Sequence, residues 1–251
     1  MKDYEEKIEA LAGLLRSSAP SFVLSGAGIS TESGIPDFRS PGTGLWSKMD
    51  PAKTASLSAL KRDPAAFYDL NLKRWRGISG AEPNDAHFAV AALEKAGLIV
   101  GVITQNIDGL HIKAGSARVW EVHGHLRTCR CMECGERHSS DILYNRYDGG
   151  ENPPLCNQCL GVLRPDVVLF EDRMSVDYFR AEKALTGCQL LIVAGSSLQV
   201  HPVAGLSNLA RRLAIINRDP TPWDERADLV INESLGKVFG DLLSALGLGL
   251  V

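Results

Sequence analysis

Short apolar runs rich in β-branched residues recur along the chain, and helical patterns fall between several of them. The runs are continuous rather than alternating with polar residues, which is typical of strands covered on both faces of a parallel sheet. They lie at 22–26, 98–104, 119–124, 190–195, 213–217 and 227–232. Among the helical patterns, residues 85–97 end on Lys95 and Gly97, as expected at a helix C-terminus. The alternation predicts an α/β fold with a Rossmann-like, doubly wound parallel sheet.

Five of the six cysteines lie between positions 129 and 159. Cys131 and Cys134 form one C-x2-C pair, and Cys156 and Cys159 form a second, with 21 residues between the pairs. Four thiolates from such pairs bind Zn²⁺ tetrahedrally and leave no open position for water, so we expect one structural Zn²⁺. A redox pair or uncoordinated thiols are the alternatives. Cys129 has poorer geometry for this motif and is expected to be a filler residue.

Two segments interrupt the α/β pattern. Residues 33–84 hold no convincing strand, and residues 125–164 contain the cysteine cluster. We expect residues 1–32, 85–124 and 165–251 to form the Rossmann-like domain. The helical insert 33–84 and the zinc ribbon 125–164 are expected to form a smaller lobe.

The charge balance excludes some classes of partner. Lys and Arg total 27 and Asp and Glu total 30, a formal net charge of −3, which argues against nucleic acid as a partner. The chain opens with acidic residues where the apolar part of a secretory signal would lie. The longest stretch without charged residues, 187–210, has a continuous apolar run only at 190–194, too short for a membrane span. We expect a cytoplasmic protein without a membrane partner, where clustered thiols usually bind metal.

A glycine-rich loop follows the first apolar run, at Gly26–Ile29. Glycines at this place let the backbone approach a pyrophosphate. Thr31 occupies the position of the third glycine of the dinucleotide-binding pattern, and no second strand ends in an acid about twenty residues later. An ordinary nicotinamide dehydrogenase is therefore disfavoured, and a turn without a ligand is the alternative.

Polar loops also follow the later apolar runs. Because the carboxyl ends of parallel strands share one edge of the sheet, these loops are expected to surround one crevice. They lie at 104–111, 122–126, 195–202 and 216–222. One of them offers His123, for which a functional role is favoured over a purely structural one.

Together these segments resemble the sirtuins, the NAD-dependent protein lysine deacylases, in the form of a prokaryotic-type single catalytic core. The resemblance runs in family order from about residue 8 to the end of the chain. It rests on 26–46, 104–111, the His-Gly pair at 123–124, the cysteine pairs, 163–168 and 195–202. It implies that NAD⁺ and an acyl-lysine side chain of a protein or peptide meet between the two lobes.

The resemblance also assigns the residues that bind NAD⁺. The phosphates and the adjacent ribose would contact Gly26, Ala27, Gly28 and Ile29, and the cofactor-binding loop would include Asp37, Phe38 and Arg39. The nicotinamide and ribose pocket would be lined by Gln105, Asn106, Ile107 and Asp108. The adenosine half would contact Gly195, Ser196, Ser197, Asn217, Arg218 and Asp219, with Leu235 as a last contact.

The implied catalytic residues are His123, as general base, and Asn106. Nicotinamide is already a cationic substituent and leaves neutral, so the carboxylate pair of an ordinary glycosidase is not needed. Once the acyl oxygen has attacked the ribose carbon, one base must activate a ribose hydroxyl, which suits a histidine with a pKa of about 6.5. The products would be free lysine, nicotinamide and acylated ADP-ribose. An ADP-ribosyltransferase of the same fold and a non-catalytic NAD sensor are the alternatives.

The substrate peptide is expected to add as a strand between two loops. Its implied contacts are Val168, Leu169, Phe170, Glu171 and Val200. The family usually has glycine where this chain has Glu171, so we expect an altered loop backbone and a preference for basic residues flanking the acyl-lysine.

The sequence also bears on the acyl group. Sirtuins that favour succinyl-lysine resemble one another in a Tyr-x-x-Arg pair, whereas Asn71 stands three residues after Tyr68 here. The nearest basic residue is then Lys73. We therefore expect a neutral acyl group such as acetyl.

Overall fold

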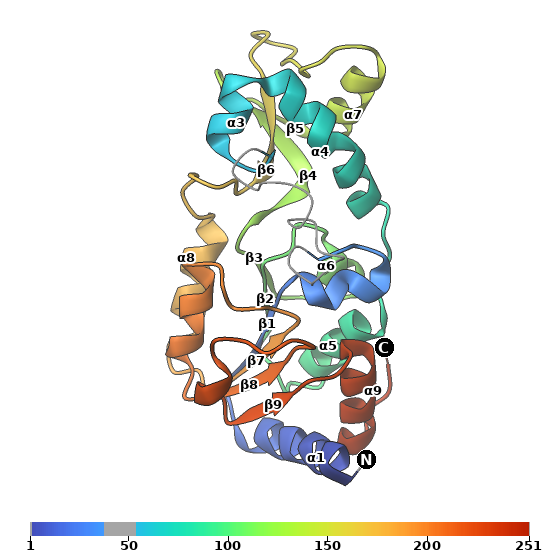
Figure 1. Ribbon diagram of the computed structural model, residues 1–251, viewed down its shortest axis with the longest axis vertical. Coiled ribbons are helices and arrows are strands. Elements are labelled where there is room, and N and C mark those ends of the chain that lie inside the picture. Colours follow the sequence, from blue (N-terminus) through green and yellow to red (C-terminus); the bar gives the residue numbers. More distant parts are fainter. Residues whose placement is uncertain (1, 38–53, 251) are drawn as a thin grey trace.

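The computed structural model describes residues 2–37 and 54–250. These residues contain a six-stranded parallel sheet with the order β3-β2-β1-β7-β8-β9 (Figure 1). The strands are β1 (Ser21–Ser25), β2 (Val102–Thr104), β3 (Val119–Glu121), β7 (Leu190–Ala194), β8 (Arg212–Ile216) and β9 (Leu229–Ile231). The chain proceeds outward from β1 through β2 to β3 and later returns to β7 on the other side of β1. This order is that of the doubly wound Rossmann-like fold, which confirms the predicted fold class.

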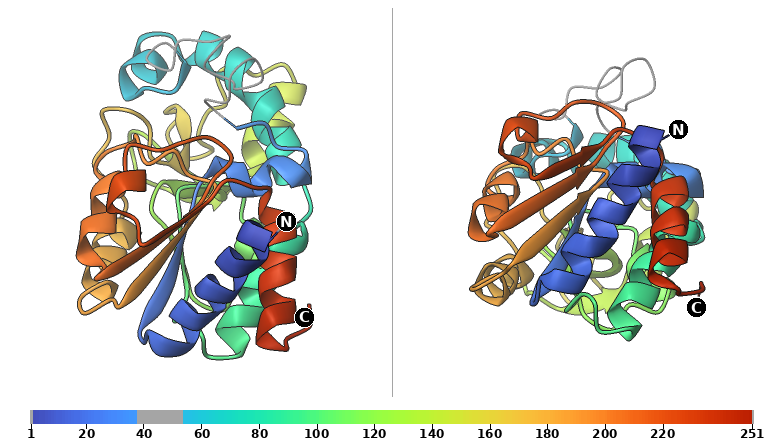
Figure 2. Two further views of the ribbon diagram at one scale, coloured as in Figure 1. Left: turned by 60° about the horizontal axis from the view of Figure 1, so that its bottom comes forward. Right: turned by 90° about the horizontal axis from the view of Figure 1, so that it is seen from below.

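Helices cover both faces of this sheet. One face packs against α1 (Lys2–Ser17), α5 (Asp85–Lys95) and α9 (Leu235–Leu246), and α1 and α9 lie side by side (Figure 2). The other face packs against α8 (Val176–Ala184) and the 3₁₀ helix η3 (Val203–Leu209). In β7, Ile192 belongs to the first apolar cluster, whereas Leu191 and Val193 belong to the second. Alternate side chains enter opposite layers, which is why the strand is apolar throughout.

The described residues also form a three-stranded antiparallel sheet with the order β5-β4-β6. Its strands are β4 (Gly124–Cys131), β5 (Arg137–Ser139) and β6 (Leu163–Val167). It lies at the opposite end of the molecule from α1, together with α3 (Leu57–Arg62), α4 (Pro64–Ser79) and α7 (Asp141–Asp148) (Figure 1). β4 begins one residue before the predicted insert and β6 continues beyond it; the domain boundaries themselves stay a prediction.

Helix α4 shows why the helical insert folds as it does. The side chain of Asp63 caps the helix by accepting a hydrogen bond from Ala66 N at 3.0 Å, and Pro64 occupies the first turn, where its missing N–H costs nothing. Phe67, Tyr68 and Trp75 are buried and pack in T-shaped ring pairs in the core of the small sheet. Trp75 and Ile78 on this same face also border the site described below. Within the described residues, no helix combines the length and apolar character needed to cross a membrane.

Three short helical segments complete the large sheet's connections. They are η1 (Ala27–Ser33), α6 (Leu110–Lys113) and η4 (Asp224–Arg226). Two buried histidines, His87 on α5 and His111 on α6, pack ring against ring with centroids 4.9 Å apart. Ser25 donates its hydroxyl hydrogen to Thr104 and lies 2.9 Å from Nε2 of His111, which therefore carries the proton of the neutral ring. Burial lowers the pKa of His87 to about 4 and also lowers that of His111.

These histidines should make the fold acid-sensitive. Both have a folded-state pKa below the unfolded value of about 6.5, so the unfolded chain takes up protons first as the pH falls. Their contribution to the free energy of unfolding is therefore present in full above pH 6.5 and is lost as pH falls towards 4. From His87 alone, the free energy of unfolding should fall by about 2 kcal/mol between pH 7.5 and pH 5. Urea unfolding of the wild type and His87→Phe at both pH values measures this, and the variant should lose less stability. Equal losses in the two proteins would contradict it; the exposed His201, replaced by Gln, serves as the control.

Candidate active site

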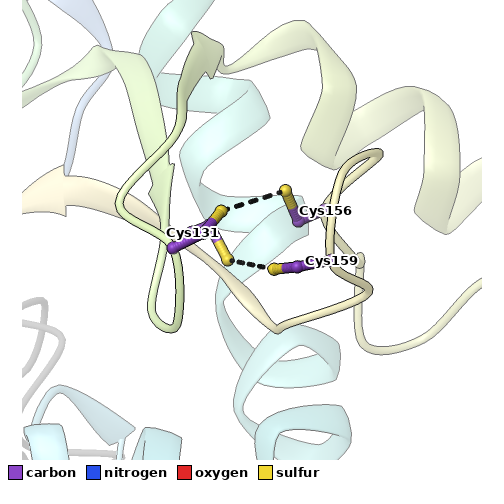
Figure 3. A group of neighbouring side chains, drawn as sticks. Cys131, Cys156 and Cys159 are labelled. Atoms are coloured by element: carbon purple, nitrogen blue, oxygen red, sulfur yellow. Dashed lines mark hydrogen bonds between the residues drawn. The ribbon is translucent and has the colours of Figure 1, made fainter.

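The four cysteines of the two C-x2-C pairs converge. Their sulfur atoms all lie within 4.8 Å of one another, in the set Cys131, Cys134, Cys156 and Cys159. The Sγ–Sγ distance is 3.4 Å from Cys131 to Cys159 and 3.7 Å from Cys134 to Cys156 (Figure 3). Tetrahedral Zn²⁺ with Zn–S bonds of about 2.3 Å places its sulfur ligands about 3.8 Å apart. The thiols thus fit one Zn²⁺, and with four sulfur ligands the ion has a structural role.

Neighbouring groups orient these sulfur atoms. The backbone N–H groups of Glu133 and Gln158 each donate to the sulfur two residues earlier, at 3.4 Å. Such bonds fix the direction of a metal-binding thiolate. Cys129 lies outside the cluster, is buried in the core of the small sheet, and contacts Ser139 O at 3.7 Å. Burial raises the pKa of the Cys129 thiol to about 12, which suits a core residue rather than a ligand.

A cleft of about 940 Å³ opens where the parallel strands end. Its walls come from the loops after β1, β2, β7 and β8, from the segment after β6, and from the helical insert. This volume is near the upper end of the range of about 300–1,000 Å³ that ligand pockets occupy. The cleft lies at the crossing point between β1 and β7, where doubly wound sheets bind ligands.

Two loops touch through their backbones at the floor of this cleft. Gly28 N–H donates to the carbonyl oxygen of Gly195 at 2.8 Å. A Cβ on Gly28 would lie 2.7 Å from the Cα of Gly195, and Gly195 itself has φ +64°. Neither position accepts a side chain, because the space is taken by the other loop. The glycine pattern thus leaves bare backbone at the crossing point, a surface that suits a pyrophosphate.

A network of side-chain hydrogen bonds fixes the loop after β2. The amide nitrogen of Asn106 donates to Gly26 O at 3.1 Å and to Ser30 Oγ at 3.0 Å, and Ser30 donates to Asp108 Oδ2 at 2.7 Å. Both donors of the Asn106 amide are therefore used, which sets the direction of its Oδ1. Burial raises the pKa of Asp108, against the hydrogen bonds from Leu110 N and Ser30 that lower it.

His123 is held by the same loop. Its Nδ1 lies 3.0 Å from Gln105 O, and because a carbonyl oxygen only accepts, Nδ1 must carry the proton. In the neutral ring, Nε2 then keeps its lone pair. Burial lowers the pKa of His123, opposed by the bond to Gln105, so the neutral form is favoured near pH 7. The next residue, Gly124, must be a glycine, because a Cβ there would lie 2.1 Å from Asp166 O.

The segment after β6 is fixed on several sides. Val168 N–H donates to His123 O at 2.8 Å, and Phe170 pairs with residues 55–57 through two backbone bonds. The buried Arg164 forms two bonds to the Asp172 carboxylate, at 2.6 and 3.1 Å, and Leu169 N–H donates to the same carboxylate at 2.9 Å. The segment beside His123 is therefore rigidly placed.

Glu171 adopts a backbone conformation that favours glycine. Its φ is +74°, in the left-handed region that is costly for a residue with a Cβ. Its carboxylate accepts hydrogen bonds from Ser58 N–H and Ser58 Oγ, both at 2.9 Å, near the start of α3. The carboxylate is thus used within the chain, and the predicted change in the loop backbone stays a prediction. The preference for basic flanking residues stays a prediction.

Most of the predicted site residues line this one cleft. They are Gly26, Ala27, Gly28, Asp37, Gln105, Asn106, Ile107, Asp108, His123, Val168, Leu169, Phe170, Glu171, Gly195, Ser196, Ser197, Val200, Asn217 and Asp219. Arg218 and Leu235 line an adjoining hollow of about 60 Å³ instead. The side chain of Ile29 packs in the core between the sheet and its helices, away from the cleft. Phe38 and Arg39 lie outside the described residues.

The sequence did not indicate several residues that also line the cleft. Ser30 comes from the glycine-loop helix, and Asn71, Arg74, Trp75 and Ile78 come from α4. The only signal for the α4 residues was their helical spacing, which places them on one face but does not say what that face borders.

The fold and the cleft define a class: a Rossmann-fold dinucleotide-binding protein whose second sheet carries a four-cysteine zinc site. The Sir2 family model matches residues 26–202, and this chain belongs to the Sir2 family. NAD-dependent protein deacetylase 2 of Caldanaerobacter subterraneus subsp. tengcongensis is 50% identical over 231 residues, which cover 92% of each chain.

Solved structures agree with this assignment. A Sir2 protein with a deacetylated p53 peptide and 3′-O-acetyl-ADP-ribose matches with a TM-score of 0.92 at 34% identity, covering 97% of this chain and all (100%) of the other. A Sir2 protein with a p53 peptide and NAD⁺ matches with a TM-score of 0.87 at 34% identity, covering 96% and 99%.

Single cysteine substitutions should distinguish the zinc ligands from Cys129, which lies near them but does not bind the ion. We expect Cys156→Ser to lose the bound zinc and to destabilise the small sheet, because a three-thiolate site binds the ion far more weakly. Cys129→Ser is the matched control and should keep one zinc per chain. Zinc content by atomic emission, with thermal unfolding of each variant, measures this. A Cys156→Ser protein with full zinc content would contradict the assignment.

Substitutions of Glu171 should separate the stabilising effect of its hydrogen bonds to Ser58 from the cost of its left-handed backbone. Glu171→Ala loses the bonds from Ser58 and keeps the left-handed backbone, so the free energy of unfolding should fall by about 1–2 kcal/mol. Glu171→Gly loses the same bonds but relieves a backbone cost of about 1 kcal/mol, so it should be the more stable variant. Urea unfolding measures both, with Glu182→Ala on the exposed side of α8 as the control. Equal stability of the two Glu171 variants would contradict this reading.

Proposed function

We propose that this chain is an NAD-dependent protein lysine deacylase that transfers the acyl group of acyl-lysine to ADP-ribose and releases nicotinamide. The observation that carries this is the neutral His123, with Nδ1–H bonded to Gln105 O, in the same cleft as the bare glycine backbone. A base and a pyrophosphate-binding surface in one cavity suit a reaction on the ribose of a dinucleotide. The relatives named as NAD-dependent protein deacetylases support the same activity.

NAD⁺ enters this reaction as a substrate and supplies a cationic leaving group. We assign its phosphates to the backbone of Gly26, Ala27 and Gly28, where the contact with Gly195 leaves no room for a side chain on either glycine. The adenosine half is assigned to the loops after β7 and β8, where Ser196 and Asn217 line the cleft. The family roles of Asp37, Phe38, Arg39, Arg218 and Leu235 are kept as part of the proposal, whereas Ile29 is assigned a packing role.

The nicotinamide end is assigned to the loop after β2. Asn106 is locked by Gly26 and Ser30, so its Oδ1 is available to orient a ligand without a loss of side-chain freedom on binding. Gln105 connects this loop to the other wall, because its side chain donates to Ser196 Oγ at 2.8 Å while its carbonyl holds His123. His123 Nε2 would take the proton of a ribose hydroxyl, and the lowered pKa keeps Nε2 unprotonated near neutral pH.

The acyl-lysine peptide is assigned to the segments 168–171 and 199–202, with Val168, Leu169, Phe170, Glu171 and Val200 as contacts. The backbone of Phe170 is already paired with residues 55–57, so a peptide would add along the opposite edge of that segment. The zinc ribbon 125–164 and the helical insert 33–84 would form the small lobe that carries one wall of the cleft. We also propose a cytoplasmic location, because zinc-binding thiols are typical of a reducing compartment.

The deciding experiment is mass spectrometry of an acetyl-lysine peptide incubated with the protein, with and without NAD⁺. We expect loss of the acetyl group only with NAD⁺, together with equal amounts of nicotinamide and acetyl-ADP-ribose. Nicotinamide release that is independent of the peptide would point instead to an ADP-ribosyltransferase, and no release at all to an NAD sensor. Either result would contradict the proposal.

His123→Ala should reduce turnover by about 10²-fold or more, the size typical of a lost general base. Zinc content and thermal unfolding should stay close to those of the wild type, because the ring makes a single backbone hydrogen bond. His125→Gln, two residues later and outside the cleft lining, is the control and should remain active. Full activity of His123→Ala would rule out the assigned base.

A further inference from the structure

An ion pair spans the link between the two sheets, residues 122–123, which carries His123. β3 ends at Glu121 in the large sheet, and β4 begins at Gly124 in the small sheet. The carboxylate of Glu121 accepts hydrogen bonds from both terminal nitrogens of Arg127 on β4, from Nη1 to Oε1 at 2.7 Å and from Nη2 to Oε2. The assigned base therefore lies on the stretch of chain between the two charged partners.

Arg127 also covers the loop after β2. A Cβ on Gly109 would lie 3.1 Å from Nη1 of Arg127, so the guanidinium packs directly against this loop. The preceding residue of β4, Leu126, donates its N–H to Ile107 O in the same loop at 3.3 Å. This is the loop that holds the ring of the assigned base through Gln105 O. The ion pair is thus in contact with β3, with β4 and with the loop that bonds the ring.

Helix α8 fixes the backbone of the link to the large sheet. Ser175 donates its hydroxyl hydrogen to Val122 O at 2.8 Å, and Asp177 accepts a hydrogen bond from Glu121 N–H at 3.3 Å. Because α8 packs on the large sheet, these bonds hold the link to that sheet alone. The ion pair differs from them, because it joins the last residue of a large-sheet strand to a strand of the small sheet.

The ion pair is better suited to orientation than to stability. The side chain of Glu121 is 6% exposed and that of Arg127 is 47% exposed. Within residues 2–37 and 54–250, only Arg127 bonds to this carboxylate. A buried ion pair stabilises a fold little more than apolar side chains of similar size, because desolvation offsets most of the attraction. Two hydrogen bonds from a planar guanidinium, however, fix direction as well as distance.

We propose that Glu121 and Arg127 are positioning residues, and that their ion pair sets the place of His123 relative to the large sheet and the loop after β2. The inference rests on the proposed deacylase function, in which Nε2 of His123 takes the proton of a ribose hydroxyl. The hydrogen bond of the ring itself goes to Gln105 O, so the pair acts through the backbone on either side of the ring.

The kinetic test replaces both partners at once, so that no buried charge is left without its counter-charge. In Glu121→Met with Arg127→Met, kcat for an acetyl-lysine peptide should fall by about tenfold, because a small displacement of a catalytic group slows the reaction strongly. KM for NAD⁺ and for the peptide should stay within about twofold, since the groups assigned to bind them are unchanged. Arg127→Lys keeps the charge but loses the planar fork, and should give an intermediate kcat.

The matched control removes another arginine of β4. Arg130 pairs with Asp166 on β6, so this ion pair joins two strands of the small sheet only. Arg130→Met should therefore keep the kcat of the wild type.

A spectroscopic measurement tests the positioning without relying on turnover. The Nδ1–H of His123 should give a slowly exchanging imidazole N–H signal by NMR, identified by its loss in His123→Ala. In the double variant we expect this signal to shift and to exchange faster, because the bond to Gln105 O is loosened. The midpoint of thermal unfolding should stay unchanged or rise, because both charges are removed together.

Three results would overturn the proposal. One is an unchanged kcat in the double variant, and another is a higher KM for NAD⁺ as its main effect, which would place the pair in ligand binding. The third is a lower unfolding midpoint with kcat and the Nδ1–H signal unchanged, as expected of a purely structural pair. If the wild type removes no acetyl group with NAD⁺, the deacylase function fails, and the Nδ1–H signal then decides by itself whether the pair positions His123.

Discussion

The cleft depends on one close backbone contact between the loops that follow β1 and β7. Gly28 and Gly195 approach so closely that a Cβ on either would strike the other loop. The contact lies where the order of the parallel sheet reverses, so the loops on both sides of it border one space. Because both residues are glycines, polar backbone groups form the floor of the cleft. This floor can receive a charged ligand without displacing protein atoms.

From this floor the polar side chains are placed by bonds to one another. Asn106 connects the loop after β2 to Gly26 in the glycine loop, and Gln105 connects it to Ser196 after β7. His123 lies directly before β4, where the chain leaves the large sheet for the small one, and its backbone carbonyl accepts a hydrogen bond from Val168 N–H. The assigned base therefore stands where the two sheets meet, and its position depends on both. The zinc site stabilises the small sheet and takes no part in the chemistry.

The parallel sheet and the zinc site could be predicted because their signals are local. A strand buried on both faces must be apolar throughout, as β7 is. The spacing of paired cysteines predicts a metal site by itself. The sequence predicts less well those features that depend on tertiary packing, such as the direction of a side chain or the length of a strand. Ile29 has the right position in the glycine loop, yet its side chain is turned into the core. The run at 98–104 forms a strand only at Val102–Thr104, although Val100 N–H still donates to Ser21 O of β1 at 2.8 Å.

The sequence by itself determined the class of the large sheet, the four metal ligands and the polar residues that follow the strands. Each of these follows from patterns within a few residues of chain. Only the tertiary structure decided which side chains of α4 line the cleft and which groups bind the charged side chains of Glu171 and Arg74. Glu171 is bonded to Ser58, 113 positions away in the chain, and Arg74 stands in the cleft without a carboxylate partner among the described residues. Partners so distant in sequence are chosen by packing, which no local pattern encodes.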